Sequence, residues 1–130
     1  MINIRNNCFE TNSSSTHAIT MCLESDYNAW RKGNLFFCDN YKNKSGKKFF
    51  TFDEMMIFIR DTLHQEEDVI QSLSTLRDSD VETFEDELYE YDFYTFDMYP
   101  RSEYYETYSC KFTPPEGKTI VAFGYYGESY

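Results

Sequence analysis

Hydrophobic and polar residues alternate near both ends of the chain, a pattern that is typical of β-strands with one buried face. Residues 18–23 predict the first strand, and residues 35–38 predict a short buried one. Residues 104–113 and 118–126 flank the turn sequence Pro-Pro-Glu-Gly and therefore predict a β-hairpin. Because the second strand of this hairpin is apolar on both faces, we expect it to be central in its sheet.

Between these strands, apolar residues recur at helical spacing after N-terminal capping residues. Ser25 predicts a short helix over residues 26–32 that ends at Gly33. The capping-box sequence that begins at Thr51 predicts a second helix, and a third follows with an acidic first turn at residues 66–68.

Ser79 and Glu82 form another capping-box sequence, which predicts a fourth helix that enters the most acidic part of the chain. Helical spacing then divides this segment into an apolar face and an acidic face. The residues expected to face inward are Val81, Phe84, Leu88 and Tyr91.

Strands at both ends and helices between them predict an α+β fold, in which an antiparallel sheet carries two or three helices on one face. The sheet would combine the four predicted strands, and most of the helical cover would come from residues 52–91. A length of 130 residues predicts a single domain over residues 1–130. Since such a sheet pairs the two ends of the chain, we expect residues 9–17 and 124–127 to lie close together. At Gly124 and Gly127 we expect a bulge or a close backbone approach.

The stretch from Ser79 to Phe112 combines negative charge with aromatic rings. Between Asp61 and Glu106 there are fifteen Asp and Glu residues against two Arg, and nine of the twenty residues at 89–108 are Tyr or Phe. Acidic segments stay unfolded when they are poor in aromatic and hydrophobic residues. We therefore expect this stretch to fold and to hold its carboxylates on a fixed surface.

The net charge of −11 bears on the class of partner. Binding to nucleic acid or to anionic membranes requires clustered Lys and Arg, so neither is expected as a direct partner. The expected partner is a cationic nucleic-acid-binding protein, although acidity that only keeps a small protein in solution is an equally open interpretation. No feature of the sequence indicates an oligomeric state. The carboxylates expected to contact a partner are Asp80, Glu82, Glu85, Asp86, Glu87, Glu90, Asp92 and Asp97.

Between Phe9 and His17, small hydroxyl residues and an asparagine predict a loop. The favoured interpretation is a hydrogen-bonded turn that leads into the first strand. In a second interpretation the loop binds a phosphate- or nucleotide-containing ligand, and His17 adds positive charge when it is protonated. Catalysis by a Ser–His pair has the least support, because neither a glycine elbow nor a third triad member is recognisable, and no catalytic residue is assigned. The candidate ligand residues are Asn12, Ser13, Ser14, Ser15 and His17.

Two segments carry a resemblance: Phe-Glu-Thr-Asn-Ser-Ser-Ser-Thr-His at residues 9–17, and residues 113–127, which end in Phe-Gly-Tyr-Tyr-Gly. They resemble the signature segments of a family of small proteins that bacteria and their phages encode. The resemblance implies a phage or mobile-element setting and supplies no catalytic residue. With the acidic stretch, it leads to the hypothesis that the protein inhibits a nucleic-acid-binding bacterial defence protein, such as a CRISPR effector, by mimicking nucleic acid. Binding of a small phosphate-containing ligand is the alternative.

Cys8, Cys22, Cys38 and Cys110 include no closely spaced pair of the kind found in zinc sites. We expect four free thiols, no bound metal and no cofactor. Neither a signal peptide nor an apolar run of membrane-spanning length is recognisable. The expected location is therefore the cytoplasm of a bacterial host, where thiols stay reduced.

Overall fold

The computed structural model describes residues 15–100 and 105–128, and for Ser15, Thr16, His17 and Glu128 it describes the backbone alone. The chain divides into two compact units, residues 1–28 with 100–130, and residues 29–99. We call them unit 1 and unit 2. The prediction of one domain over residues 1–130 stays a prediction.

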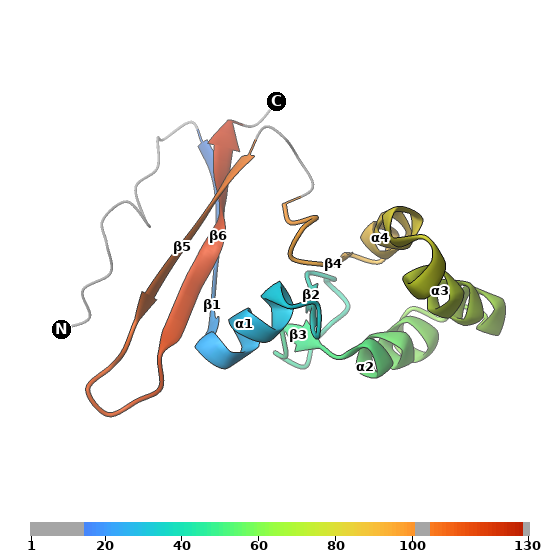
Figure 1. Ribbon diagram of the computed structural model, residues 1–130, viewed down its shortest axis with the longest axis horizontal. Coiled ribbons are helices and arrows are strands. Elements are labelled where there is room, and N and C mark those ends of the chain that lie inside the picture. Colours follow the sequence, from blue (N-terminus) through green and yellow to red (C-terminus); the bar gives the residue numbers. More distant parts are fainter. Residues whose placement is uncertain (1–14, 101–104, 129–130) are drawn as a thin grey trace. The chain divides into compact units, whose positions relative to one another are not determined.

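Unit 1 contains an antiparallel sheet of three strands in the order β1-β6-β5 (Figure 1). The strands are β1 (Ser15–Leu23), β5 (Tyr105–Phe112) and β6 (Ile120–Glu128). The hairpin that the sequence predicts is confirmed, because Tyr105 pairs with Gly127 and Phe112 pairs with Ile120. The prediction that its second strand is central is also confirmed.

The first strand begins earlier than the sequence predicts. Ser15, Thr16 and His17 belong to β1, opposite Glu128, Gly127 and Tyr126, so a loop that extends to His17 is wrong for these three residues. The reason is competition for backbone hydrogen bonds. Hydroxyl side chains favour local turns only where no strand offers ladder partners, and β6 offers them here. The expected proximity of the two segments is confirmed for residues 16 and 17.

The first helix follows β1 without an intervening loop. The helix α1 (Glu24–Arg31) begins where the backbone N–H of Glu24 donates to the carbonyl of Thr119, two residues before the predicted start. Gly33 ends the helix region as predicted, with a φ of +85° that favours glycine.

Unit 2 contains a second small antiparallel sheet, in the order β3-β2-β4. Its strands are β2 (Phe36–Cys38), β3 (Phe49–Phe50) and β4 (Phe93–Tyr94). The expectation that residues 35–38 join the other strands in one sheet is therefore wrong. Every residue of β2 is buried, so its sequence shows no alternation from which a partner or a register can be predicted.

The helices of unit 2 follow the predicted order (Figure 1). They are α2 (Phe52–Ile57), a π-helical turn η2 (Phe58–Thr62), α3 (Glu67–Ser79) and α4 (Val81–Glu90). The capping box at the start of α2 is confirmed. The N–H of Glu54 donates to Thr51 Oγ1 at 3.2 Å, and the N–H of Thr51 donates to Glu54 Oε1 at 2.8 Å.

The N-terminal cap of α4 differs from the prediction by one residue. Asp80 accepts from the Thr83 N–H at 3.2 Å, whereas the hydroxyl of Ser79 donates to the Thr75 carbonyl within α3. A carboxylate is favoured over a hydroxyl here because it carries full charge to the positive end of the helix. The hydroxyl of Thr83 also donates to Asp80, and the two hydrogen bonds from Thr83 lower the pKa of Asp80.

Phenylalanine is the most frequent residue in the core of unit 2. Tyrosines of the described chain are half-buried or exposed, whereas many phenylalanines are buried. The tyrosine hydroxyl explains this difference, because it needs water or a hydrogen-bond partner. Trp30 is buried, and its indole N–H donates to the carbonyl of Tyr94 at 3.0 Å. The core cluster comprises Phe36, Cys38, Phe50, Met55, Met56, Phe58, Ile59, Leu73, Phe84, Leu88 and Phe93. Helices together with antiparallel strands confirm the α+β class.

Candidate protein-binding surface

The helix α4 holds its carboxylates in place by burying its opposite face. Phe84 and Leu88 are buried in the core cluster, and Tyr91 packs against it, as the sequence predicts. Val81 is 59% exposed, so the prediction that it faces inward is wrong. It is the first helical residue, and there the chain is still entering the helix from its Asp80 cap.

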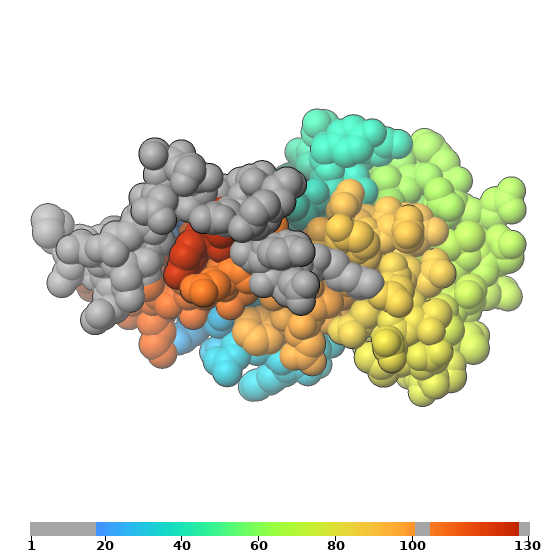
Figure 2. Space-filling view, turned by 90° about the horizontal axis from the view of Figure 1, so that it is seen from above, coloured from blue at the N-terminus to red at the C-terminus, as the bar shows by residue number. Residues whose placement is uncertain are grey.

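The outer face of α4 presents Glu82, Asp86, Glu87 and Glu90 to solvent, and Figure 2 shows the helix, in yellow, at the surface of unit 2. Among the described residues, no lysine or arginine forms an ion pair with Glu82, Glu87 or Glu90. The ion pairs of the described chain join Lys47 to Glu54, Arg60 to Asp61 and Lys111 to Glu24. We call Glu82, Asp86, Glu87 and Glu90 the acidic surface.

Arg77, near the end of α3, does not form an ion pair with Glu82, Glu87 or Glu90. Its guanidinium lies over the ring of Phe52, 4.2 Å from the ring centroid, and not against a carboxylate of the described chain. A guanidinium on an aromatic face gains a cation–π interaction while its stem covers apolar surface.

The charge density of α4 is close to that of a nucleic-acid strand. Four exposed carboxylates occur in its ten residues. At about 1.5 Å of rise per residue, this is one exposed carboxylate per about 4 Å of helix axis. One strand of duplex DNA carries a phosphate charge about every 3.4 Å.

Glu85 and Asp80 belong to the predicted contact set, but both have structural partners. Glu85 is half-buried and accepts a hydrogen bond from the hydroxyl of Thr95, which joins α4 to the segment after β4. Asp80 caps the helix. Their carboxylates therefore stabilise unit 2, and a variant that removes them tests folding together with binding.

Asp92 is, with Glu85, one of two predicted carboxylates that are half-buried. It is half-buried, and it adopts a left-handed backbone with a φ of +60° just after α4. Burial raises its pKa, and the nearby Asp39 raises it further. The pKa of Asp39 is raised by burial in turn, although Lys48 opposes this. Asp97 is exposed beyond β4.

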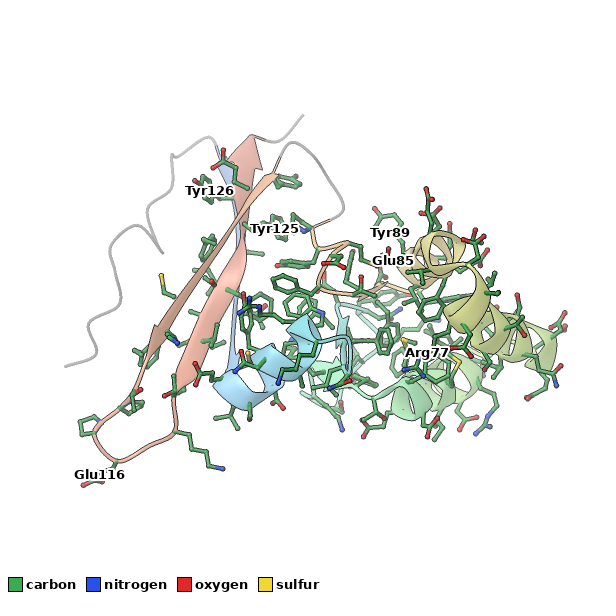
Figure 3. The ribbon with its side chains drawn as sticks, in the orientation of Figure 1. Arg77, Glu85, Tyr89, Glu116, Tyr125 and Tyr126 are labelled. Atoms are coloured by element: carbon green, nitrogen blue, oxygen red, sulfur yellow. The ribbon has the colours of Figure 1, made fainter. Side chains whose placement is uncertain are left out.

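Tyr89 is a residue that the sequence prediction missed. It is 42% exposed, and Figure 3 shows it beside Glu85 on α4. Its ring meets that of Tyr94 edge-on at 6.0 Å between centroids. Exposed tyrosines supply much of the contact energy in protein interfaces, so Tyr89 is a candidate aromatic contact beside the acidic surface. Tyr89 follows Glu82 by seven residues, which is two helical turns, so both lie on one side of the helix. This spacing could have identified Tyr89 from the sequence.

The candidate ligand loop is covered only at its end. Asn12, Ser13 and Ser14 lie outside the described residues, whereas Ser15 and His17 lie in β1. His17 pairs with Tyr126, whose hydroxyl donates to Glu106 Oε2 at 2.8 Å and has its pKa raised by that bond.

A hollow of about 340 Å³ lies at the far end of the same sheet, where β1 meets α1 and the hairpin turn. Neither Ser15 nor His17 is among its lining residues. The described part of unit 1 therefore does not join this hollow to the candidate loop. The lining residues are Leu23, Glu24, Ser25, Thr113, Gly117, Lys118 and Thr119.

The cysteines differ from the prediction at Cys110. Cys110 in β5 is disulfide-bonded, so the expectation of four free thiols is wrong. Cys22 and Cys38 are free, and Cys8 lies outside the described residues. Spacing along the chain does not specify which cysteines meet in a fold. No group of three His, Cys, Asp or Glu side chains suited to a metal ion occurs in the described ranges.

Family models, curated proteins and solved structures yield no match to this chain. None of the helices in the described ranges has the length and apolar character needed to cross a membrane. What the acidic surface binds is therefore inferred from the chemistry of its own residues.

Proposed function

We propose that this protein is an acidic interaction protein that occupies the cationic groove of a nucleic-acid-binding bacterial defence protein, such as a CRISPR effector. One observation carries the proposal. Glu82, Glu87 and Glu90 have no ion-pair partner among the described residues, and they project from a helix that Phe84 and Leu88 anchor in the core. A groove lined with Lys and Arg would pair with carboxylates held at this spacing and would then exclude the nucleic acid.

The position of the charges favours binding over solubility alone. Acidity that only keeps a protein in solution requires no ordered row and no adjacent aromatic residue. Here the carboxylates lie on one anchored helix, which also carries the exposed side chain of Tyr89. An aromatic anchor within a charged rim is the arrangement that protein interfaces favour.

The energetics favour a fast encounter over strong single contacts. An exposed ion pair contributes only about 0–1 kcal/mol, so no carboxylate of the acidic surface accounts for tight binding by itself. Several like charges together raise the association rate by about ten- to a thousandfold at low salt. Tyr89, with carboxylates that lose water on contact, would then slow dissociation.

The biological setting is part of the proposal. A phage or other mobile element would encode the protein, and it would act in the cytoplasm of the bacterial host, where effectors that bind nucleic acid work. Reduced thiols no longer support this location, because Cys110 is disulfide-bonded. The location therefore rests on the proposed partner.

A ligand-binding function for the Ser15–His17 end of the loop gains no support from a specific observation. These residues pair with β6 through the backbone, and their side chains are not described. We therefore advance neither this function nor a catalytic one.

The test is displacement of labelled duplex DNA from a panel of bacterial nucleic-acid-binding proteins that includes guide-loaded CRISPR effectors, followed by fluorescence anisotropy. The parent protein is expected to release the duplex from at least one of them. The double variant Glu87→Lys with Glu90→Lys is expected to lose this effect. Both changes lie in the last turn of α4, where positive charge suits the helix dipole, so the fold is retained.

A matched control carries the same change in net charge elsewhere. Asp53 in α2 and Glu116 at the tip of the hairpin turn are exposed, and Figure 3 shows Glu116 at that tip. The variant Asp53→Lys with Glu116→Lys is expected to displace the duplex as the parent does. Equal loss of displacement in both double variants would show that net charge, and not the acidic surface, is responsible. A parent protein that displaces nothing from the panel would contradict the proposal.

A further inference from the structure

We propose that β1 is a dimerisation edge, at which a second copy of this chain pairs antiparallel with it and extends the sheet of unit 1 to six strands. The proposal rests on the backbone register of the sheet and on the side chains of its two edge strands. It is independent of the acidic surface.

The edge itself is long and open. The strand β1 has nine residues, and in the described part of the chain it pairs on one side with β6 and on the other side with no strand. An open edge presents a row of backbone N–H and C=O groups that another strand can satisfy. Such edges are the usual site of strand addition between protein chains.

The two edges of the sheet differ in how they are protected. Natural edge strands are guarded against pairing by charged residues, proline or bulges. The strand β5 carries Glu106 and Lys111, which are both exposed. The nine residues of β1, Ser-Thr-His-Ala-Ile-Thr-Met-Cys-Leu, include no Asp, Glu, Lys, Arg or Pro. Only one edge of this sheet is therefore unguarded.

An apolar row lies along the unguarded edge. Ile19, Met21 and Leu23 alternate along β1 and therefore share one face, and they are 39%, 52% and 40% exposed. A strand that pairs with this edge would cover part of each side chain. The partner must itself lack Asp, Glu, Lys and Arg at the paired positions, and β1 of a second copy meets this condition.

The strand is compatible with itself under a two-fold axis. With the axis at Ile19, the middle residue of β1, each Ile19 lies opposite its copy, and Met21 lies opposite His17. The remaining pairs join Ser15 to Leu23, Thr16 to Cys22 and Ala18 to Thr20. None of these places two like charges opposite each other, so the net charge of each chain acts only from a distance and is screened by salt.

The axis predicts a specific crosslink. Residues directly opposite each other in an antiparallel pair have Cα atoms about 4.5–5.5 Å apart, within the range of about 4.4–6.8 Å that a disulfide spans. In a Cys22→Ser background, Ile19→Cys is therefore expected to form a covalent dimer under mild oxidation. Thr107→Cys in the same background, on the guarded edge, is expected to stay monomeric. Absence of the Ile19→Cys dimer, or equal crosslinking by both variants, would overturn the register.

The uncrosslinked protein supplies the second measurement, its mass by light scattering over a range of concentrations. The parent is expected to change from monomer to dimer as concentration rises. Met21→Lys adds a guarding charge at an exposed position, so it is expected to raise the concentration of half-dimerisation by about tenfold or more. Thr107→Lys is the matched control on β5 and is expected to behave as the parent does. A parent that is monomeric throughout, or a Met21→Lys variant that dimerises as the parent does, would overturn the proposal.

Discussion

The hydroxyl of Tyr108 donates a hydrogen bond of 2.8 Å to the backbone carbonyl of Ala18 and so connects β5 to β1 across the central strand. Gly124 of β6 lies between them. A Cβ atom on this glycine would lie 1.8 Å from the Ala18 oxygen and 2.9 Å from the Tyr108 hydroxyl oxygen. The missing side chain of Gly124 therefore permits the contact that joins the two edge strands of unit 1.

Replacement of Gly124 by alanine is predicted to destabilise the protein strongly. The nearest atom is backbone, so a strand has to shift, and overpacking of this kind costs about 3 kcal/mol or more. Gly117→Ala is the control, because its Cβ would lie 3.4 Å from the nearest atom of Pro114, in an exposed turn. The measurement is urea unfolding of both variants. Similar unfolding midpoints for the two would contradict this account of Gly124.

Tyr108→Phe isolates the hydroxyl. The ring remains, and only the hydrogen bond to Ala18 is lost, so the free energy of unfolding is expected to fall by about 0.5–1.5 kcal/mol. Tyr41→Phe is the control, because Tyr41 is 75% exposed and its change is expected to be close to zero. An equal effect of the two substitutions would show that the bond to Ala18 contributes nothing.

Features with a local cause were predictable from the sequence. The Thr51 capping box, the end of the first helix region at Gly33 and the hairpin over the Pro-Pro-Glu-Gly turn each depend on a few adjacent residues. The close approach at Gly124 was predictable in kind, because a glycine within a strand marks such a place. The atoms that make this approach are 16 and 106 residues from Gly124 along the chain, and local pattern does not identify them.

Features that depend on distant partners were not predictable. The three residues of β2 select β3 and β4 as neighbours through packing among phenylalanines, for which the sequence contains no register signal. The disulfide state of Cys110 likewise depends on which chain segments meet.

Within the candidate surface, helical spacing identified the exposed carboxylates of α4. Helical spacing did not reveal that the carboxylate of Glu85 turns towards Thr95, because that partner lies beyond the helix. The sequence also predicted Ser79 as the cap of α4, where Asp80 caps it, because adjacent residues with capping side chains differ by one position only.

Asp92→Asn is predicted to stabilise the protein at neutral pH, by less than about 1 kcal/mol. The pKa of Asp92 is raised above its ordinary value of 3.8 by burial and by Asp39, so its ionised form is disfavoured in the folded state. The contribution of Asp92 to stability is therefore fully present below pH 3.8 and is lost as pH rises through its raised pKa. Asparagine has nearly the same shape and tolerates the left-handed backbone at this position.

The measurement is the difference in the free energy of unfolding between Asp92→Asn and the parent, as a function of pH. The difference is expected to be positive at pH 7 and to vanish below the ordinary carboxyl pKa. A difference that is independent of pH would show that the charge of Asp92 is not responsible. Asp97→Asn, at an exposed carboxylate, is the control and is expected to show no such dependence.

The thiols of Cys22 and Cys38, which are free in the described part of the chain, are predicted to be unreactive in the folded protein. Burial raises the pKa of Cys22 to about 11, with a further contribution from Asp26, and burial also raises the pKa of Cys38. Since the thiolate is the nucleophile, alkylation by iodoacetamide at neutral pH is expected to be slow until the protein unfolds. Cys110 is expected to react only after reduction. Mass spectrometry of alkylated peptides would contradict this if native Cys22 reacts as fast as a free peptide thiol.

The central claim is that the acidic surface steers the protein to a cationic groove, and the association rate constant tests it most directly. It is measured by stopped-flow mixing with the effector from which the protein displaces duplex DNA most strongly, at low and at physiological salt. Screening beyond about 8 Å at physiological salt is expected to slow the parent by about tenfold or more. The Glu87→Lys with Glu90→Lys variant is expected to associate slowly at both salt concentrations. Equal rate constants for the parent and this variant at low salt would contradict the claim.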